Sequence, residues 1–203
     1  MSATQLHNIE HSHTSLKESE LRILLDIVES TVRCYLDKLP LPQLVLSEFP
    51  QSLQQLGACF VTLHVDGQLQ GCIGTTSESS PLVLEVQRKA WASACQDSRF
   101  APLQKHQASG LEIEVSVLST PIALEVTTEQ ELLDVLRHKH CGVILEDAYH
   151  HALFLPQVWE QLPTPSEFVT HLKLKGGWTQ HYWSDNIQVK LFDVANKARA
   201  YQN

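Results

Sequence analysis

The sequence predicts an α+β fold, with a mainly antiparallel or mixed sheet and flanking helices. Three observations predict it. Residues 61–75 carry a β-hairpin signal, residues 111–118 alternate strictly between apolar and polar, and capped helical segments lie between such strands. Strands that pair through hairpins favour this class over a doubly wound parallel sheet. A chain of 203 residues is long enough to bury a core as one domain.

Helices are predicted where a capping signal precedes apolar residues at helical spacing. Four segments meet this condition: a capping box from Ser15 to Glu18 before a helix that Pro40 ends, Ser80-Pro81 with Pro at the first helical position, a capping box from Thr128 to Glu131, and a capping box from Thr164 to Glu167 with Gly176 as the C-cap. An extended linker is expected between the first helix and about residue 57.

Strands are predicted from alternation and from turn residues. The expected strands are the hairpin over Asp66-Gly67, residues 111–118, a second hairpin of residues 142–146 and 151–155 across Asp147-Ala148, and a last strand at residues 187–194. Asp-Gly favours a type I′ turn because glycine accepts a positive φ.

The first hairpin places a cysteine where the chain leaves the sheet. With Asp66-Gly67 as the turn, strict alternation pairs Cys72 with Val61 and points His64 to the opposite face. Gly71 and Gly74 flank Cys72, and they allow a backbone or a small ligand to approach closely. From spacing alone, Cys72 is either a buried small apolar residue or a functional thiol.

The composition narrows the class of protein. A net charge of −8 disfavours nucleic acid as a partner, and no apolar run reaches the roughly 20 residues of a membrane helix. No secretory signal is visible at the start of the chain, and residues 1–14 are expected to be flexible. Five cysteines without a CxxC motif fit reduced thiols, so a cytoplasmic location is expected. The eleven histidines match no metal-site spacing, so neither a metal nor a cofactor is expected.

Four stretches occur in an order that resembles a known family. They are residues 61–75, the segment 97–103 (DSRFAPL), residues 111–118 (LEIEVSVL) and residues 152–174. These resemble the AmmeMemoRadiSam system protein A family, also called the AMME syndrome candidate gene 1 domain family, over residues 21–194. The resemblance implies that residues 15–203 form one α+β domain with two lobes, the second smaller, and a cleft between them. The family usually has arginine two residues before the cysteine, where this chain has Gln70.

Three residues are candidates for chemistry: Cys72 as a nucleophile or thiol donor, Glu114 as an acid–base group, and Arg99 as an anchor for an anion. Glu112 and Glu114 lie on one face of a strand, roughly 7 Å apart, and that face is either solvated or catalytic. Arg99 either binds an anion or has a structural role, in which it caps carbonyls at a helix end or pairs with Asp97.

The resemblance implies a pathway shared with Memo-type and radical-SAM proteins as partners. The first hypothesis is an enzyme or enzyme component that handles a small molecule or modified group. The alternative is a noncatalytic protein-interaction module of the same system.

Overall fold

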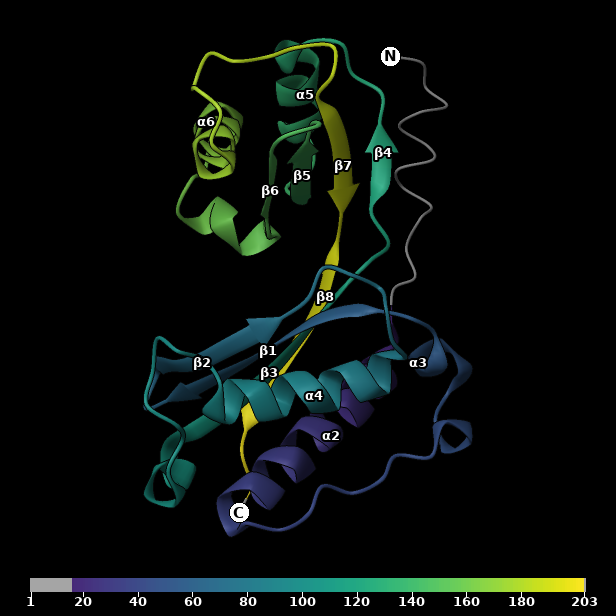
Figure 1. Ribbon diagram of the computed structural model, residues 1–203, viewed down its shortest axis with the longest axis vertical. Helices are drawn as coiled ribbons and strands as arrows, with labels where there is room; N and C mark the ends of the chain where they lie inside the picture. The colour runs from purple at the N-terminus through teal and green to yellow at the C-terminus, as the bar shows by residue number, and fades with distance from the viewer. Residues whose placement is uncertain (1–15, 203) are drawn as a thin grey trace. The chain divides into compact units, whose positions relative to one another are not determined.

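The structure, a computed structural model, describes residues 16–202 and divides them into two compact units (Figure 1). The discontinuous unit comprises residues 16–118 and 195–202, and the inserted unit comprises residues 119–194. Each unit has its own four-stranded sheet and its own hydrophobic core. The predicted flexible segment, residues 1–14, lies outside the described residues.

The discontinuous unit has its strands in the order β2-β1-β3-β8. Its elements are α2 (Glu18–Asp37), η1 (Leu46–Glu48), α3 (Gln51–Gln54), β1 (Ala58–Val65), β2 (Gln68–Gly74), α4 (Leu82–Cys95), η2 (Lys105–Gly110), β3 (Leu111–Leu118) and β8 (Val194–Ala200). Helices α2 and α4 pack against the same face of this sheet (Figure 1).

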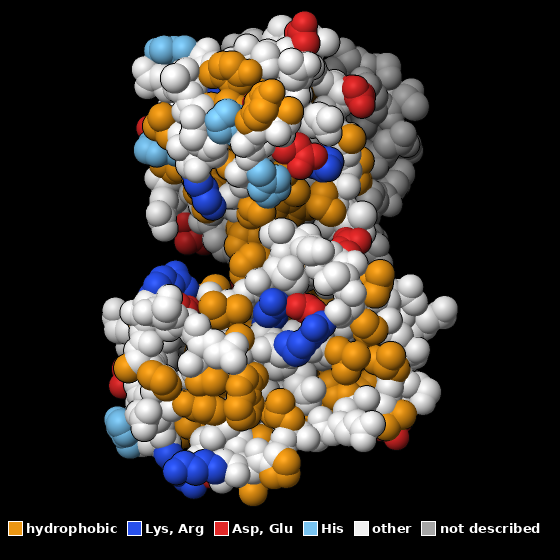
Figure 2. All heavy atoms as spheres, viewed as in Figure 1, with side chains coloured by type: hydrophobic (Ala, Val, Ile, Leu, Met, Phe, Trp, Pro, Cys, Tyr) orange, Lys and Arg blue, Asp and Glu red, His pale blue; other side chains and the backbone are white. Residues whose placement is uncertain are grey.

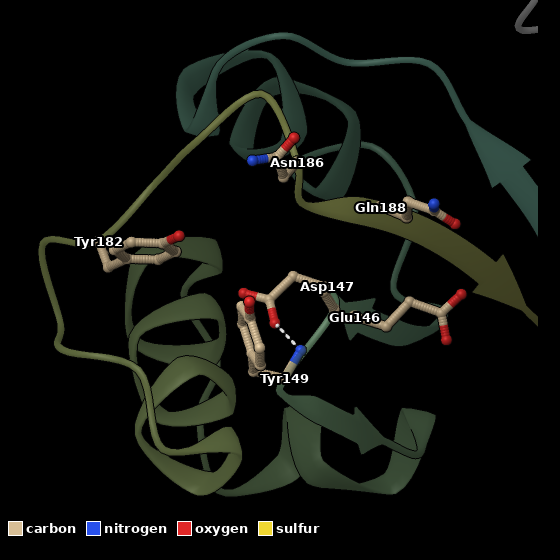
Figure 3. Close-up of a pocket in the computed structure, with 7 residues that line it drawn as sticks. Glu146, Asp147, Tyr149, Tyr182, Asn186 and Gln188 are labelled. Carbon is tan, nitrogen blue, oxygen red and sulfur yellow. Dashed lines mark hydrogen bonds between the residues drawn. The ribbon is translucent and has the colours of Figure 1, made fainter.

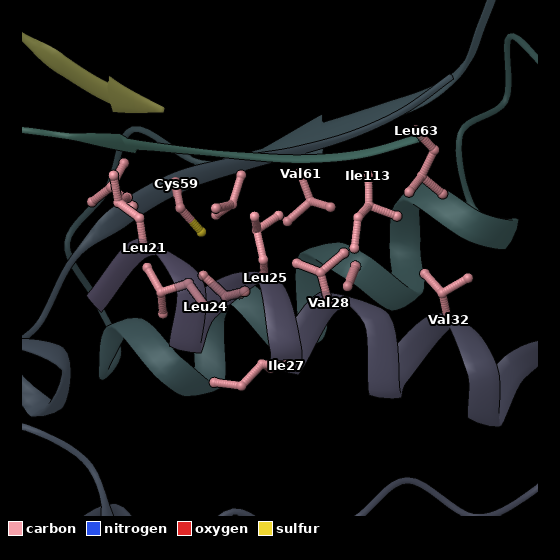
Figure 4. Packing of buried hydrophobic residues seen from close by; sticks show 14 of the residues in the cluster. Leu21, Leu24, Leu25, Ile27, Val28, Val32, Cys59, Val61, Leu63 and Ile113 are labelled. Carbon is pink, nitrogen blue, oxygen red and sulfur yellow. The ribbon is translucent and has the colours of Figure 1, made fainter. Parts of the chain in front are cut away.

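The core of this unit forms because apolar residues recur every three or four positions along α2. Leu24, Leu25 and Val28 are fully buried, and they face Val61 of β1 and Ile113 of β3, which are also fully buried (Figure 4). Odd-numbered positions of β1 therefore point to the helices, and even-numbered positions point to the other face of the sheet.

The inserted unit has the strand order β4-β7-β5-β6. Its elements are β4 (Ile122–Leu124), α5 (Glu129–Leu136), β5 (Gly142–Glu146), β6 (His151–Phe154), η3 (Pro156–Glu160), α6 (Pro165–Gly176) and β7 (Gln188–Phe192). In its core, the rings of Trp159 and Phe168 stack with centroids 4.0 Å apart. The side chain of Lys173 is completely buried beside this core and pairs with Glu129 at 2.7 Å.

The predicted fold class is confirmed. Helices flank two sheets, and every strand pair whose register is defined is antiparallel. The second hairpin pairs Glu146 with His151, as its sequence predicts. No helix among residues 16–202 combines the length and the apolar character needed to cross a membrane.

Several predicted element ends differ from the structure. The first helix begins at Glu18 with Lys17 as the N-cap, and the backbone N–H of Lys17 donates to Glu20 Oε2 at 2.6 Å. The reciprocal glutamate is thus Glu20, and Ser15 lies outside the described residues. Pro81 is the N-cap of α4 and not its first residue. Gly177, with φ of 89°, and not Gly176, caps α6.

The predicted last strand, residues 187–194, is wrong as one element. The chain forms β7 up to Phe192 and begins β8 of the other sheet at Val194. Between them, the N–H of Asp193 donates to Ser119 Oγ, and the N–H of Ser119 donates to the carbonyl oxygen of Asp193. Ser119 and Asp193 therefore pair where the chain enters and leaves the inserted unit.

The first hairpin has the predicted turn but a different register. Asp66 and Gly67 both have positive φ, as a type I′ turn requires, and Val65 pairs with Gln68. A β-bulge between Leu63 and His64 then shifts the pairing by one residue.

The bulge changes the neighbours of the cysteine. Cys72 pairs with Thr62, and Val61 pairs with Ile73. The prediction that Cys72 lies across from Val61 with His64 on the opposite face is wrong. Thr62 and His64 are both even-numbered positions of β1, so Cys72 and His64 belong to the same face.

Candidate functional site

Three side chains with functional groups that can take part in chemistry lie in one row across the sheet of the discontinuous unit. Thr62 pairs with Cys72 on β2 and with Glu114 on β3. Because paired residues of adjacent strands point the same way, a thiol, a hydroxyl and a carboxylate lie side by side. This row, Cys72–Thr62–Glu114, is on the face that α2 and α4 leave free.

The thiol has a hydrogen-bond partner within the row. The hydroxyl of Thr62 donates to Cys72 Sγ at 3.2 Å. A neutral thiol is a weak acceptor, but a thiolate accepts a charge-assisted hydrogen bond. The contact therefore holds the sulfur in a fixed position beside the Thr62 hydroxyl.

The backbone of the cysteine is bracketed by Asp97 and Arg99. The N–H of Cys72 donates to Asp97 Oδ2 at 2.9 Å, and Arg99 Nη2 donates to the carbonyl oxygen of Cys72 at 3.1 Å. Arg99 and Asp97 also form an ion pair at 2.7 Å. The hydrogen bond from Arg99 holds the pKa of Asp97 well below its usual range, and the same bond raises the pKa of Arg99.

The pair of Arg99 with Asp97, which the sequence offers as one alternative, is present in the structure. Two of its nitrogens donate to the Asp97 carboxylate, through Nε at 2.9 Å and Nη2 at 2.7 Å. The Arg99 side chain remains 58% exposed, whereas that of Asp97 is 4% exposed. The guanidinium thus positions the cysteine backbone and still presents a surface to solvent.

Gln70, two residues before the cysteine, links two segments of the unit. Its Nε2 donates to the carbonyl oxygen of Ala101 at 2.6 Å, and its Oε1 accepts from Gln107 Nε2 at 3.2 Å. Leu63 pairs with Gly71 and His64 pairs with Leu69, so Gln70 is the extra residue of the bulge. This position therefore supplies a neutral amide contact instead of a positive charge.

Helix α4 holds the cysteine strand by close backbone approach. A Cβ on Gly71 would lie 2.1 Å from the carbonyl oxygen of Ser93, so only glycine fits there. The Ser93 hydroxyl accepts from the N–H of Ile73 at 3.0 Å and donates to the carbonyl oxygen of Val61 at 2.7 Å. The close approach predicted for Gly71 is thus made by the helix backbone.

Glu114 accepts hydrogen bonds from two neighbours on the same face. Ser116 Oγ donates to its Oε1 at 3.2 Å, and Asn196 Nδ2 of β8 lies 3.5 Å from the same oxygen. Glu112 is exposed and pairs with His64, whose buried Nδ1 has no hydrogen-bond partner. The polar face therefore extends over four strands.

The five free thiols differ in their surroundings. Cys59 and Cys141 are buried, and burial raises the pKa of each thiol to about 12. Burial also raises the pKa of Cys95. Cys34 and Cys72 are half-buried.

The sequence identified Cys72, Arg99 and Glu114, and the structure places all three in the discontinuous unit. It brings Arg99 to the Cys72 backbone and places Glu114 two strands from the thiol. Sequence reasoning missed the contribution of Thr62, because the bulge that aligns it with Cys72 has no turn residue to mark it. Within residues 16–202, no three His, Cys, Asp or Glu side chains are grouped to hold a metal ion.

Comparisons with known proteins agree on one family. The chain is 30% identical over 183 residues to the protein Mbar_A1807 of Methanosarcina barkeri, covering 88% of this chain and 89% of that protein. It is 29% identical over 160 residues to the protein MJ0810 of Methanocaldococcus jannaschii, covering 75% and 78%.

A solved structure is also similar. The crystal structure of the uncharacterized protein PH0010 from Pyrococcus horikoshii has a TM-score of 0.78 and 26% sequence identity, covering 92% of this chain and 94% of that one. The AMMECR1 family profile matches residues 25–196, and these residues include the whole Cys72–Thr62–Glu114 row. The chain therefore belongs to the AMMECR1 family.

Proposed function

We propose that the protein is an enzyme, or a component of an enzyme, that acts on a small molecule or a modified group through the thiol of Cys72. The observation that carries the proposal is the Cys72–Thr62–Glu114 row, in which the Thr62 hydroxyl donates to the sulfur. A structural cysteine in a core needs no such donor, and buried cysteines usually face apolar neighbours.

The row supplies the parts of a nucleophilic addition. The thiol proton passes to a base, and the sulfur lone pair forms a bond to an electrophilic carbon such as that of a carbonyl group. The π electrons of that carbon move to its oxygen, which takes up a proton. Glu114 lies two strand spacings of about 5 Å each from the sulfur, so the thiol proton and the proton taken up by the oxygen are exchanged with solvent. Glu114 acts as acid or base on a second group of a substrate that spans this distance.

Arg99 has a positioning role and a binding role in this scheme. Its contacts with Asp97 and with the Cys72 carbonyl oxygen fix the strand end that carries the thiol. Its exposed edge retains donors for an anionic group of the substrate, since guanidinium has five N–H groups in a fixed plane.

The proposed partners rest on the resemblance to the AmmeMemoRadiSam system protein A family. We propose that the protein works in one pathway with Memo-type and radical-SAM proteins and that it does not bind nucleic acid. The net charge of −8 supports the second statement. A titration showing submicromolar affinity for DNA or RNA at about 150 mM salt, with a steep salt slope, would contradict it.

A second candidate function, a noncatalytic interaction module, is favoured by exposed apolar side chains. Leu39, Leu41 and Val45 are 53%, 40% and 48% exposed, and all lie in the segment that follows α2. Hydrophobic side chains also reach the surface in groups on the face shown in Figure 2. Such groups are typical of surfaces that contact other proteins.

Alkylation of the native protein tests the proposal. In brief iodoacetamide treatment at pH 7, mapped by mass spectrometry, we expect Cys72 to react faster than Cys34, Cys59, Cys95 and Cys141. Thr62→Val should slow the reaction of Cys72 about five-fold, because a hydrogen bond contributes about 1 kcal/mol.

The control in this experiment is Cys34, whose rate Thr62→Val should leave unchanged. If Cys72 reacts no faster than the buried Cys59, Cys72 is a packing residue. The enzyme proposal then fails and the interaction module remains.

A further inference from the structure

The inserted unit contains a pocket of about 560 Å³ at the turn between β5 and β6. Figure 3 shows its labelled lining residues: Glu146, Asp147, Tyr149, Tyr182, Asn186 and Gln188. All belong to residues 119–194, and none belongs to the Cys72–Thr62–Glu114 row. The size is within the usual range of small-ligand sites.

Asp147 gives one wall of the pocket a fixed negative charge. Its Oδ1 accepts from the N–H of Tyr149 at 2.8 Å (Figure 3). The same oxygen accepts from the N–H of His150 at 2.8 Å, and Oδ2 accepts from Trp178 Nε1 at 2.7 Å. The hydrogen bond from Trp178 is the main cause that lowers the pKa of Asp147 to about 2. This carboxylate orders the turn and stays ionised at neutral pH.

Glu146 supplies a second carboxylate beside the amide of Gln188, with which it pairs across β5 and β7. Its Oε1 forms an ion pair with Lys190 Nζ at 2.6 Å, and the Glu146 side chain remains 27% exposed. Two histidines also lie at this turn: the Nδ1 of His150 is 3.1 Å from Asp147 Oδ1, and His151 pairs with Glu146 across the hairpin. Each of these basic groups thus lies beside a carboxylate, and no lysine or arginine lines the pocket.

Two tyrosines complete the pocket. Tyr149 is 91% exposed, which is unusual for so large an aromatic side chain, and Tyr182 is 38% exposed. Exposed aromatic faces attract a cation through the ring quadrupole. Carboxylates, tyrosine rings and amide oxygens together form a lining rich in acceptors and in negative potential.

We propose that this pocket binds an organic cation, an alkylammonium group. The carboxylates of Glu146 and Asp147 provide the field, the Tyr149 and Tyr182 rings contact the apolar carbons and the charge, and the amide oxygens of Asn186 and Gln188 accept its N–H donors. A phosphate or carboxylate ligand is disfavoured by the same charges. The group is either a free amine or the side chain of a lysine in another protein. The site is independent of the function proposed for Cys72.

The test follows the side-chain NH₂ signals of Asn186 and Gln188 by ¹H–¹⁵N NMR of the full chain. The probes are butylammonium, the neutral 1-butanol and the anion butyrate. We expect a saturable shift with butylammonium only. Two further probes, acetyl-Gly-Lys-Gly-amide and the same peptide with norleucine, distinguish the source. Tighter binding of the lysine peptide identifies a protein side chain, and tighter binding of butylammonium identifies a free amine.

Variants connect the binding to the pocket. Tyr149→Ala and Glu146→Gln should each weaken butylammonium binding about three-fold or more, whereas Tyr149→Phe should bind nearly as the wild type does. The matched control is Glu160→Gln, which removes an exposed carboxylate of the same unit outside the pocket. Equal shifts with 1-butanol or butyrate, or equal loss in Glu160→Gln, would overturn the proposal. Because Tyr149 is exposed, its variants preserve the fold and keep the test decisive.

Discussion

Replacing Asp97 by alanine should destabilise the discontinuous unit by about 2–4 kcal/mol. The Asp97 carboxylate is 4% exposed and accepts the N–H of Cys72, and a hydrogen bond to a charged acceptor contributes about 1.5–3 kcal/mol. The pair with Arg99 adds about 0–1 kcal/mol, because the Arg99 side chain is 58% exposed. Asp26→Ala is the control. Its pair with Arg199 has a carboxylate that is 65% exposed, so its loss should cost less than about 1 kcal/mol.

The assay uses the two fully buried cysteines. Cys59 lies in the discontinuous unit and Cys141 in the inserted unit, and both are 0% exposed. Pulsed alkylation at increasing urea concentration, analysed by mass spectrometry, therefore reports the unfolding of each unit separately. We expect Asp97→Ala to lower the Cys59 midpoint by about 1–2 M urea, given slopes of about 1–3 kcal/mol per M. The Cys141 midpoint should stay within error.

The pH dependence has a defined sign. Because the pKa of Asp97 is lower in the folded than in the unfolded state, its contribution is complete above the unfolded pKa of about 3.9 and is lost as the pH falls through the folded pKa. The difference between wild type and Asp97→Ala should be constant from about pH 5 to pH 8 and should shrink below about pH 4. A Cys59 midpoint that shifts no more in Asp97→Ala than in Asp26→Ala would refute the reasoning.

Two further predictions concern buried contacts, one in each unit. Gly71→Ala should destabilise the discontinuous unit by at least as much as a typical overpacked core substitution, about 1–3 kcal/mol, because its Cβ would lie 2.1 Å from the Ser93 carbonyl oxygen. The Cys59 labelling midpoint should fall accordingly, and an unchanged midpoint would mean that the helix and strand can separate without a loss of stability. Glu129→Gln should destabilise the inserted unit by about 3–5 kcal/mol, because it leaves the buried Lys173 ammonium without a counter-charge. Adding Lys173→Met to Glu129→Gln should recover part of that loss in thermal unfolding, and failure to recover any would exclude the charge as the cause.

Local signals in the sequence were sufficient for the element types. The caps at Thr128 and Thr164 are present, with Thr128 Oγ1 accepting from Glu131 N and Thr164 Oγ1 from Glu167 N. The Asp66-Gly67 turn is present because its chemistry depends on two residues only. These features are decided within a few positions, and a sequence displays them directly.

Non-local features could not be predicted in the same way. The bulge at Leu63 shifts every pair beyond it by one residue, so one extra residue changed the neighbour of Cys72 from Val61 to Thr62. The pocket of the inserted unit also gave no signal in the sequence, because Tyr182 and Asp147 lie 35 positions apart in the chain and come together only in the fold. Of the candidate site, Cys72, Arg99 and Glu114 were predicted as candidates, but Thr62 and the contacts among these residues required the structure.

The division of one sheet between two distant parts of the chain has a consequence for biosynthesis. Strand β8 is the outermost strand beside β3, and the N–H of Tyr201 donates to the carbonyl oxygen of Leu111. Arg199 also forms an ion pair with Glu29 of α2, which lies 170 positions earlier in the chain. On the ribosome, the inserted unit can fold as soon as β7 emerges, whereas the sheet that carries Cys72 stays one strand short until residues 195–202 have been synthesised. The sheet that carries the Cys72–Thr62–Glu114 row is therefore completed last, after the inserted unit that interrupts it in the sequence.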